Sequence, residues 1–352
     1  MRTPLNPPPG RGDRITSAAV ALTIDVFRAQ PGTPGPDGTT PVGQLPVITA
    51  TLTDDAAKAV QRTFTSALAR PAPTWLGTGM WLRPTIGVQQ IQPVIYRLPT
   101  VIVVAIDTAP SASGYGTVTA ADPAEVLNGR PYETDTALSG TLRSLVSDAC
   151  TIALARPTDV SAVPAIAVPA EMVAEFGTGR WDTCIKVADA LGVVLRFTDA
   201  GDVIGRLRSG PFPPPIAVVE LVEGAGRSYA ARTPTAAKVL VERGDDIGLV
   251  GTATAAQVTG TAPPGWYLPY VVTDHVQSAV GTTQAQADTL ALDLLRARLA
   301  DIDTFSSAPV LPAPWLEAGA DVVTYRGASY GVRAMTLDLP SLATTLTLRR
   351  IP

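Results

Sequence analysis

His275 is the single histidine of this 352-residue chain, and its side chain could act as a general base or as a metal ligand. A Ser-His-Asp type of triad uses a histidine as general base, and a Cys/His zinc site needs cysteines at short spacing. Cys150 and Cys184 are the only cysteines and lie far from His275 in sequence, which excludes a local Cys/His zinc cluster. A triad would depend on serine or aspartate partners that the fold brings to this residue. Because an isolated histidine rarely marks a catalytic site, we expect a solvent-exposed or hydrogen-bonded strand histidine.

Paired carboxylates are the second candidate for chemistry, because glycoside hydrolysis needs two of them across a cleft. Close pairs occur at Asp54-Asp55, at Asp245-Asp246 and at Asp199 with Asp202. Each pair stands at an expected helix cap or turn, where aspartate is favoured because its side chain binds nearby backbone N–H groups. No pair fits the spacing of an EF-hand loop, so calcium has no specific support. We therefore predict a structural role for these pairs.

Three further motifs have ordinary structural interpretations. Gly177-Thr178-Gly179 lacks the Lys-Ser/Thr of a P-loop and the third glycine of a dinucleotide fingerprint, so we expect a helix entry turn. Arg11-Gly12-Asp13 matches a cell-adhesion tripeptide, but in a Pro/Gly-rich arm it is typical of a turn. Cys150 and Cys184 fall on apolar helix faces and are expected to be buried free thiols. We thus predict no catalytic residue, no cofactor and no metal site.

The composition indicates a β-rich protein with a weakly charged surface. Charged residues make up 16% of the chain although 46% of it is hydrophobic, whereas about a quarter of an ordinary soluble domain is charged. Such a surface suits a chain covered by other subunits, and a GC-rich genome favours the same composition. A net charge of -4 argues against nonspecific nucleic-acid binding, which needs a basic face. The apolar runs 101–106 and 216–222 have the length of strands and are too short to span a membrane. No secretory signal is visible either, so we expect assembly in a cytoplasm.

The segment 176–207 predicts a helix followed by a β-hairpin. Its apolar residues recur at three- and four-residue spacing and share one helix face: Trp181, Cys184, Ile185, Ala188 and Leu191. Gly192 supplies a left-handed stop. Strand-like alternation begins at Val193, and the turn 199–202 leads into a second strand at 203–207. This unit carries almost no catalytic chemistry and is typical of a building block of an assembly.

The remaining sequence alternates strand signals with a few helices. Strands are predicted at 18–27, 45–52, 81–88, 93–106 and 237–243, with a β meander at 309–352. Helices are predicted at 54–69, 140–150 and 283–301, the last with a capping box of Thr283 and Gln286. Its buried stripe comprises Ala287, Leu290, Ala291, Leu294 and Leu295. A Pro/Gly arm occupies 1–14, and 29–43 forms a long loop.

These signals divide the chain into four parts. Residues 1–112 form a first β-barrel-like domain with the Pro/Gly arm, and 113–210 form an α+β domain. Residues 211–280 form a second β domain, which begins after the Pro-rich run 211–215. Residues 281–352 supply a helix and the meander that completes the last domain. The predicted fold class is therefore a β-dominated α+β protein.

Three runs of sequence carry a resemblance to a known family. The first is the Trp-Asp at 181–182 with the run ADALG, the aromatic strand and the turn AGD. The second is the run from Thr117 to Cys150, and the third is the element Trp315-Leu316-Glu317-Ala318-Gly319-Ala320-Asp321-Val322-Val323. Together they resemble tail hub and minor tail proteins of long-tailed bacteriophages, over about residues 115 to 350. The third run resembles the element that opens the last barrel of those proteins.

The resemblance implies a phage tail hub-like fold, with two small β-barrel domains and inserted α+β domains. Such proteins are similar to the trimeric baseplate hub of contractile phages and to the N-terminal part of tail-associated lysins. A homotrimer would form a pseudo-six-fold ring at the virion tail tip, joining six-fold tail parts to a three-fold tip around a lumen for DNA ejection. The implied partners are other copies of the chain, the distal tail protein, the tape measure protein and other tail tip proteins. Viral DNA is met only in passage, and the host surface through neighbouring proteins.

Several expectations and alternatives follow. The chain ends soon after the last barrel, so we expect no peptidase or receptor-binding extension and no enzymatic activity. Trp75, Trp266 and Tyr267 are candidate subunit contacts, because aromatic side chains dominate buried contact energy. One alternative is the hub of a contractile injection system or gene-transfer particle. Another is a receptor- or carbohydrate-binding tail protein with the loop 29–43 and Trp75 as an exposed platform, and the last is a cell-wall hydrolase.

Overall fold

The computed structural model describes most of the chain. The described residues are 19–28, 40–89, 94–108, 115–154, 158–207, 217–218, 228–231, 238–243, 250–254, 257, 273–278, 284–300, 303–310, 312–319, 321–325 and 327–351. The sequence arm 1–14, most of the loop 29–43, the pair Asp245-Asp246, Trp266, Tyr267 and Thr283 lie outside them. No helix in the described ranges is long and apolar enough to cross a membrane.

Most strands belong to one 14-stranded sheet. Its strands from the first third of the chain are β1 (Ala19–Phe27), β2 (Gly43–Gln44), β3 (Val47–Asp55), β4 (Arg62–Leu68), β5 (Trp81–Gln89), β6 (Val94–Arg97), β7 (Val101–Asp107) and β8 (Thr117–Ala121). Those from the last third are β13 (Ala217–Val218), β14 (Ser228–Ala231), β18 (Asp303–Val310), β19 (Val322–Tyr325), β20 (Ala328–Leu339) and β21 (Thr344–Arg350). The path through the sheet is β14-β18-β21-β20-β3-β4-β8-β7-β5-β1-β2, with β6 beside β5 and β19 between β13 and β20.

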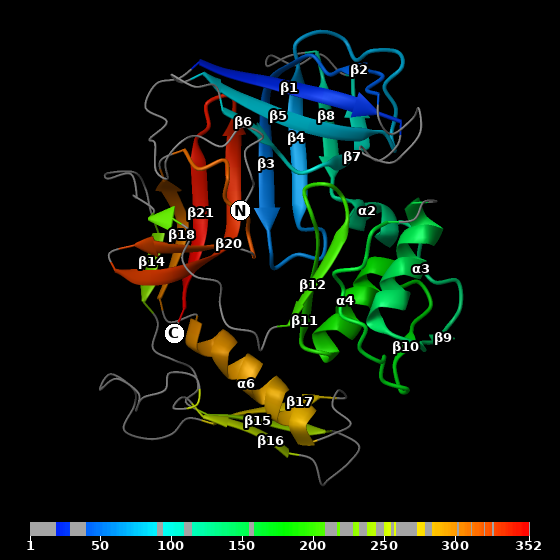
Figure 1. The fold of residues 1–352 in the computed structure, drawn as a ribbon, viewed down its shortest axis with the longest axis vertical. Coiled ribbons are helices and arrows are strands. Elements are labelled where there is room, and N and C mark those ends of the chain that lie inside the picture. Colours follow the sequence, from blue (N-terminus) through cyan, green and yellow to red (C-terminus); the bar gives the residue numbers. More distant parts are fainter. Residues whose placement is uncertain are drawn as a thin grey trace.

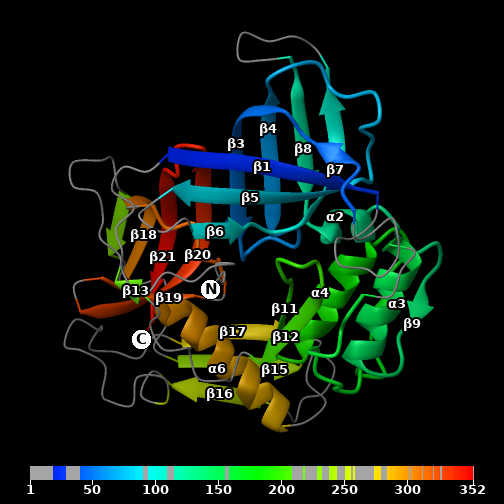
Figure 2. The same cartoon turned by 45° about the horizontal axis from the view of Figure 1, so that its top comes forward.

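The two ends of the chain meet in the middle of this sheet. Strand β20 pairs antiparallel with β3, from Ala334 opposite Asp55 to Leu339 opposite Ala50. In Figures 1 and 2, β1 and β5 cross the strands β3, β4 and β8 at a steep angle, so the sheet folds over its own core. One hydrophobic cluster runs through both ends, from Ile24 to Leu348. The first and last thirds of the chain therefore share a core.

The strand order contains one arrangement twice. The run β3-β4-β8-β7 continues into β5, and the run β14-β18-β21-β20 continues into β19. Within both runs every neighbouring pair is antiparallel. We call β3, β4, β5, β7 and β8 the first repeat, and β14, β18, β19, β20 and β21 the second repeat. The junction of β20 with β3 joins the second repeat to the first.

The α+β unit between the repeats contains the helix and hairpin that the sequence predicts. Its elements are α2 (Pro123–Asn128), β9 (Thr136–Ala137), α3 (Leu142–Leu154), β10 (Val173–Ala174), α4 (Arg180–Ala190), β11 (Val193–Phe197) and β12 (Val203–Leu207). Gly192, with φ of 65°, ends the helical region, and β11 pairs antiparallel with β12. A separate hydrophobic cluster fills this unit and includes Trp181, Cys184 and Ala188. The helix, stop and hairpin predicted for 176–207 are confirmed.

A smaller α/β unit lies between β14 and β18. Strand β15 (Lys238–Arg243) pairs antiparallel with β16 (Val250–Thr254) and parallel with β17 (Thr273–Ser278), and α6 (Gln284–Ala300) packs on this sheet. Ala287, Ala291 and Leu295 are buried, and Leu290 and Leu294 are partly buried against the same cluster. The predicted helix at 283–301 and its buried stripe are confirmed. The division of the chain at 112, 210 and 280 stays a prediction.

The predicted helix at 54–69 is wrong, because the chain forms the end of β3, a turn and β4 there. Phe64 and Leu68 suit a helical stripe, yet their spacing of four residues is also two strand periods. The burial of β4 follows the strand period, with Arg62, Phe64, Ser66 and Leu68 buried and Thr63 and Thr65 exposed. β-Branched Thr63 and Thr65 also favour a strand. The predicted strand at 93–106 is likewise two strands, β6 and β7.

Candidate functional site

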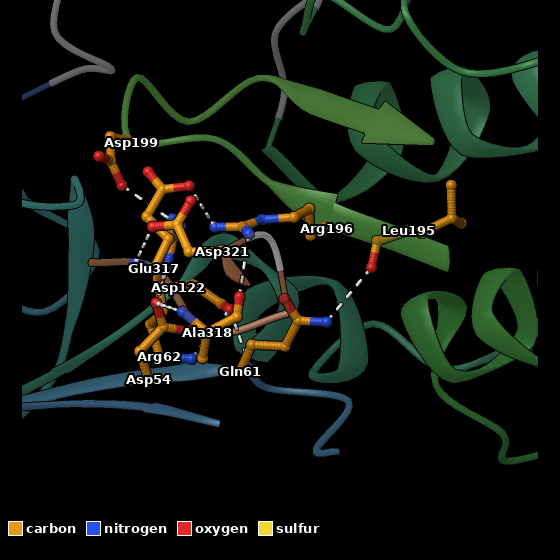
Figure 3. Close-up of polar contacts among 10 residues, drawn as sticks. All are labelled: Asp54, Gln61, Arg62, Asp122, Leu195, Arg196, Asp199, Glu317, Ala318 and Asp321. Atoms are coloured by element: carbon orange, nitrogen blue, oxygen red, sulfur yellow. Dashed lines mark hydrogen bonds and ion pairs between the residues drawn. The ribbon is translucent and has the colours of Figure 1, made fainter. Parts of the chain in front are cut away.

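A buried ionic junction is the most unusual polar feature of the described residues (Figure 3). It gathers Asp54 of β3, Arg62 of β4, Asp122 before α2, Arg196 and Asp199 of the β11–β12 hairpin, and Glu317 and Asp321 of the turn before β19. These segments come from the first repeat, the α+β unit and the second repeat. The junction therefore lies where three parts of the chain meet.

Arg62 is the centre of this junction. Its Nε lies 3.5 Å from Asp54 Oδ2, and both side chains are 1% exposed. Its second guanidinium nitrogen, Nη2, lies 3.3 Å from Asp199 Oδ1. Burial by itself would lower the pKa of Arg62, but the charges of Asp54, Asp199, Glu317 and Asp122 raise that pKa above its ordinary value. The guanidinium is thus held in its charged form by carboxylates from three parts of the chain.

Arg196 connects the α+β unit to the second repeat. Its Nη1 donates a hydrogen bond of 3.0 Å to the Ala318 carbonyl, and its Nη2 lies 3.2 Å from Glu317 Oε2. Burial and the nearby charge of Arg62 lower the pKa of Arg196, and Glu317, Asp54 and Asp199 oppose that shift. Arg196 therefore contacts two consecutive residues of the turn, Glu317 and Ala318. These contacts hold the β11–β12 hairpin against the second repeat.

Asp122 connects the first repeat to α2. Its Oδ2 accepts the backbone N–H groups of Gln61 at 3.0 Å and Arg62 at 3.2 Å, and its Oδ1 accepts that of Ala124 at 3.0 Å. The last bond caps the N-terminus of α2. Burial raises the pKa of Asp122 to about 6, while the Arg62 charge and these three backbone hydrogen bonds act in the opposite direction. One carboxylate therefore ties β4 to the start of the α+β unit.

The turn at 313–321 fits closely against the end of β3. Ala318 donates its backbone N–H to Asp54 Oδ2 at 3.4 Å, and Glu317 donates its own to Asp321 Oδ2 at 2.8 Å. Gly319 has φ of 72°, and a Cβ built on it would lie 2.7 Å from the Cβ of Ala56. Only glycine satisfies both the left-handed backbone and this close approach. The turn is shaped to its partner strand.

Three more hydrogen bonds bind the α+β unit to the first third of the chain. The Gln61 side-chain amide donates to the Leu195 carbonyl at 3.2 Å, and Thr100 donates its backbone N–H to the Asp199 carbonyl at 2.9 Å. Trp181 Nε1 donates to the Ala59 carbonyl at 3.0 Å, and its ring lies 4.7 Å from that of Phe197. Trp181 is buried in the core, as the sequence predicts. The whole arrangement holds three parts of the chain in one geometry.

The other predicted positions are placed as follows. Asp55 accepts the Ala57 backbone N–H in the β3–β4 turn, and Asp202 donates its own to Thr198 Oγ1 in the β11–β12 turn. The predicted turn at Asp202 is confirmed, whereas the predicted helix cap at Asp54-Asp55 is wrong, because Asp54 lies in a strand and an ion pair and Asp55 ends that strand at the turn before β4. Gly177 has φ of 79° and Gly179 is the N-cap of α4, which confirms the helix entry turn. His275 lies in β17 opposite Leu240, as a strand residue.

The two cysteines and Trp75 are the remaining residues whose predicted roles can be compared with the structure. Cys150 and Cys184 are buried free thiols, as predicted. Burial raises the pKa of Cys150 to about 12 and that of Cys184 further. Trp75 is partly buried against the core, with its ring over Gly43, and its role as a subunit contact stays a prediction, as do those of Trp266 and Tyr267. Within the described residues, no group of three or more His, Cys, Asp or Glu side chains could hold a metal ion.

Sequence analysis missed Arg62 and Arg196. For Arg62 a signal exists, since it alternates with Phe64 and Leu68 on the buried side of one strand. Arg196 alternates with Val193, Leu195 and Phe197 in the opposite sense, which predicts an exposed side chain, yet it is buried. The surface that covers it comes from residues more than a hundred positions away. No local pattern contains that information.

Comparison with known proteins identifies solved structures with a similar fold. No family model matches the chain, and no curated protein sequence matches it. Among solved structures, a tail protein from Neisseria meningitidis MC58 is 13% identical, with a TM-score of 0.60 over 94% of this chain and 96% of that one. The 43 kDa tail protein of prophage MuSo2 from Shewanella oneidensis is 11% identical, with a TM-score of 0.58 over 95% and 98%.

A third solved structure comes from a secretion system. An Escherichia coli protein, described as a component of the type VI secretion system and as similar to bacteriophage T4 tail proteins, is 9% identical. Its TM-score is 0.50 over 94% of this chain and 76% of that one. At such identities the likeness concerns the fold. The chain therefore has a phage tail hub-like, β-dominated fold, which confirms both the predicted fold class and the resemblance in its sequence.

Proposed function

We propose that the chain is a structural component of a phage tail tip or baseplate hub. The observation that carries the proposal is the match of fold over nearly the whole length of two tail proteins, 94% and 95% of this chain against 96% and 98% of theirs. Such end-to-end agreement covers the repeats and the inserted units together. A structural role is also favoured by the ionic junction, because its arginine and carboxylate side chains pair with one another.

In the finer form of this proposal, three copies form a ring around the tail lumen. With two similar β repeats in each copy, a trimer presents six similar modules, which lets one protein join six-fold tail parts to a three-fold tip. The partners are then other copies of the chain, the distal tail protein, the tape measure protein and other tail tip proteins. The chain works at the virion tail tip after assembly in the host cytoplasm, without enzymatic activity.

The ionic junction suits a protein that transmits force within such a ring. Arg62 and Arg196 connect the α+β unit to both repeats through charge-assisted contacts, and removing one partner of a buried pair is costly. The three segments are therefore expected to move as one body when force passes along the tail. A net charge of -4 suits a wall that DNA passes without binding.

The mass of the purified chain tests this function. We expect native mass spectrometry and light scattering to find trimers, or three copies in complexes with co-expressed tail neighbours. A chain that stays monomeric under all these conditions and never enters particles would overturn the hub proposal. A zymogram on cell-wall substrate serves as the parallel assay, in which we expect no clearing.

A second candidate function is the hub of a contractile injection system. The observation in its favour is the fold likeness to the type VI secretion component, which covers 94% of this chain. The two functions share the ring and differ in the neighbours of the hub. Co-purification from the native host separates them, because a phage hub would come down with tail tip and tape measure proteins and an injection hub with a spike and sheath.

A further inference from the structure

The two repeats carry the same turn as well as the same strand order. In the first repeat, the run Pro73-Thr74-Trp75-Leu76 folds so that Leu76 donates its N–H to the Pro73 carbonyl at 2.9 Å. In the second, Ala313-Pro314-Trp315-Leu316 folds so that Leu316 donates to the Ala313 carbonyl at 3.1 Å. Each turn places a tryptophan before the leucine. The repeats are therefore alike in sequence at this turn.

A glycine after each turn aligns the repeats residue by residue. Gly79 has φ of 82° and donates to the Val103 carbonyl at 2.8 Å, and Gly319 has φ of 72° and donates to the Val332 carbonyl at 2.7 Å. Directly after Val103 and after Val332, the pairing with the next strand shifts by a bulge. Val103 of β7 therefore corresponds to Val332 of β20.

The pairing registers extend this correspondence across the sheet. Val103 lies opposite Ala120, Ala120 opposite Phe64, and Phe64 opposite Leu52. Val332 lies opposite Leu348, Leu348 opposite Phe305, and Phe305 opposite Tyr229. Leu52, Thr53 and Asp54 of β3 thus correspond to Tyr229, Ala230 and Ala231 of β14. Beyond the bulges, Ala334, Met335 and Thr336 of β20 correspond to Ala105, Ile106 and Asp107 of β7.

Inside one chain, the second repeat joins the first through these same positions. Met335 of β20 lies opposite Asp54 of β3, and Thr336 lies opposite Thr53. The corresponding edges of β7 and β14 have no such junction among the described strands. Among the strands that the structure describes, Ala105 and Ile106 pair only with β8, and β14 pairs only with β18 and is the last strand of the sheet. One chain thus carries both halves of a second junction at separate edges.

We propose that β7 of one copy pairs antiparallel with β14 of a second copy, in the register of the β20–β3 junction. Ile106 then lies opposite Ala231, and Asp107 opposite Ala230. Such head-to-tail contact uses two different surfaces of each chain, so it closes into a ring when the rotation per copy allows. The inference rests on the ring proposed above, and it names the strand edges that build it. Backbone hydrogen bonds supply the affinity, as in other strand additions.

The central ion pair of the ionic junction belongs to the β20–β3 pairing within a chain and has no counterpart in the proposed β7–β14 pairing between chains. Ala231 corresponds to Asp54 and Asp303 corresponds to Arg62, so the second junction lacks the central ion pair. An edge with Asp54 and Arg62 needs the turn at 317–318 and Arg196 as partners. The strand β3 is therefore matched to β20 of its own chain, and β14 is left for another copy.

Cysteine pairs test the register. One chain with Asp107→Cys and a second with Ala230→Cys are co-expressed, purified as the oligomer and oxidised mildly. We expect a disulfide-linked dimer that neither chain forms alone, in a fraction about tenfold above that of Asp107→Cys with Tyr229→Cys, which is one residue out of register and on the opposite face. Native Cys150 and Cys184 are buried and do not compete.

The junction within one chain provides the reference. Thr53→Cys with Thr336→Cys in a single chain is expected to crosslink without a change of mass, because these residues are opposite one another. An oligomer of the expected mass whose 107–230 pair crosslinks no better than the shifted pair overturns the strand pairing and leaves the ring intact. A chain that neither associates nor crosslinks between copies overturns both proposals.

Discussion

Arg62 and Asp54 form an ion pair between neighbouring strands in which both side chains are 1% exposed. Removing one charge from such a pair leaves the other uncompensated in a medium that solvates it poorly. Arg62 also contacts Asp199 of the α+β unit, and Asp54 accepts a hydrogen bond from the backbone N–H of Ala318 in the second repeat. The pair therefore connects the first repeat to both the α+β unit and the second repeat.

Arg62→Met is expected to reduce the free energy of unfolding by about 3 to 5 kcal/mol, because it removes the cation of a buried ion pair with Asp54. Urea denaturation followed by tryptophan fluorescence measures the change. The matched control is Lys186→Met, which removes an exposed pair with Glu175 and is expected to cost less than about 1 kcal/mol. Equal losses for the two variants would contradict a central role for Arg62.

Gly319→Ala is expected to destabilise the chain more than Gly327→Ala. Both glycines have positive φ, 72° and 79°, so both variants incur a backbone cost of about 1 kcal/mol. Only Gly319 also brings its new Cβ to 2.7 Å from Ala56, whereas Gly327 has nothing within 4 Å. Overpacking of that kind costs about 1 to 3 kcal/mol more. Thermal unfolding of the two variants gives the comparison, and the reverse order would refute the tight fit of the turn.

Asp122 makes a definite contribution to the dependence of stability on pH. Burial raises its pKa in the folded chain from 3.8 to about 6. Between roughly pH 4 and 6 the folded state therefore holds a proton that the unfolded state has lost, so the free energy of unfolding falls as pH rises through that window. The contribution is about 1 to 3 kcal/mol for a shift of this size.

Urea titrations of the native chain and of Asp122→Asn at several pH values isolate this contribution. The asparagine keeps an oxygen that can cap α2 but does not titrate. We expect the stability of the native chain relative to the variant to decline from pH 4 to pH 7. A difference that stays constant or grows over that range would show that Asp122 has no raised pKa.

Local periodicity carried the prediction of the helix α4, the hairpin after it and the helix α6, because each buries one regular face against a neighbour. It was ambiguous at 54–69, where Phe64 and Leu68 satisfy helical and strand spacing together. It could not predict the ionic junction, since Arg62, Arg196 and Glu317 meet only after three segments have docked. The sequence marks the turns of the two repeats, but the strand register is needed to align them.

Trp75 and Trp315 hold corresponding positions in the two repeats, and this correspondence yields a prediction about association. Trp315 lies 6.1 Å from Tyr96 of β6, ring centre to ring centre, so it contacts the strand that pairs with β5 of the first repeat. By the same arrangement Trp75 is expected to face the second repeat of the next copy. Truncating a central interface tryptophan typically costs at least about 2 kcal/mol of binding free energy.

Trp75→Ala is therefore expected to raise the dissociation constant of the oligomer by about thirtyfold, which corresponds to that free energy. Analytical ultracentrifugation over a concentration series measures it. Trp315→Ala is the matched control, because it removes the same side chain from the junction within one chain and is expected to lower unfolding stability with little change in association. If both variants associate as the native chain does, Trp75 packs only on its own core and is no subunit contact.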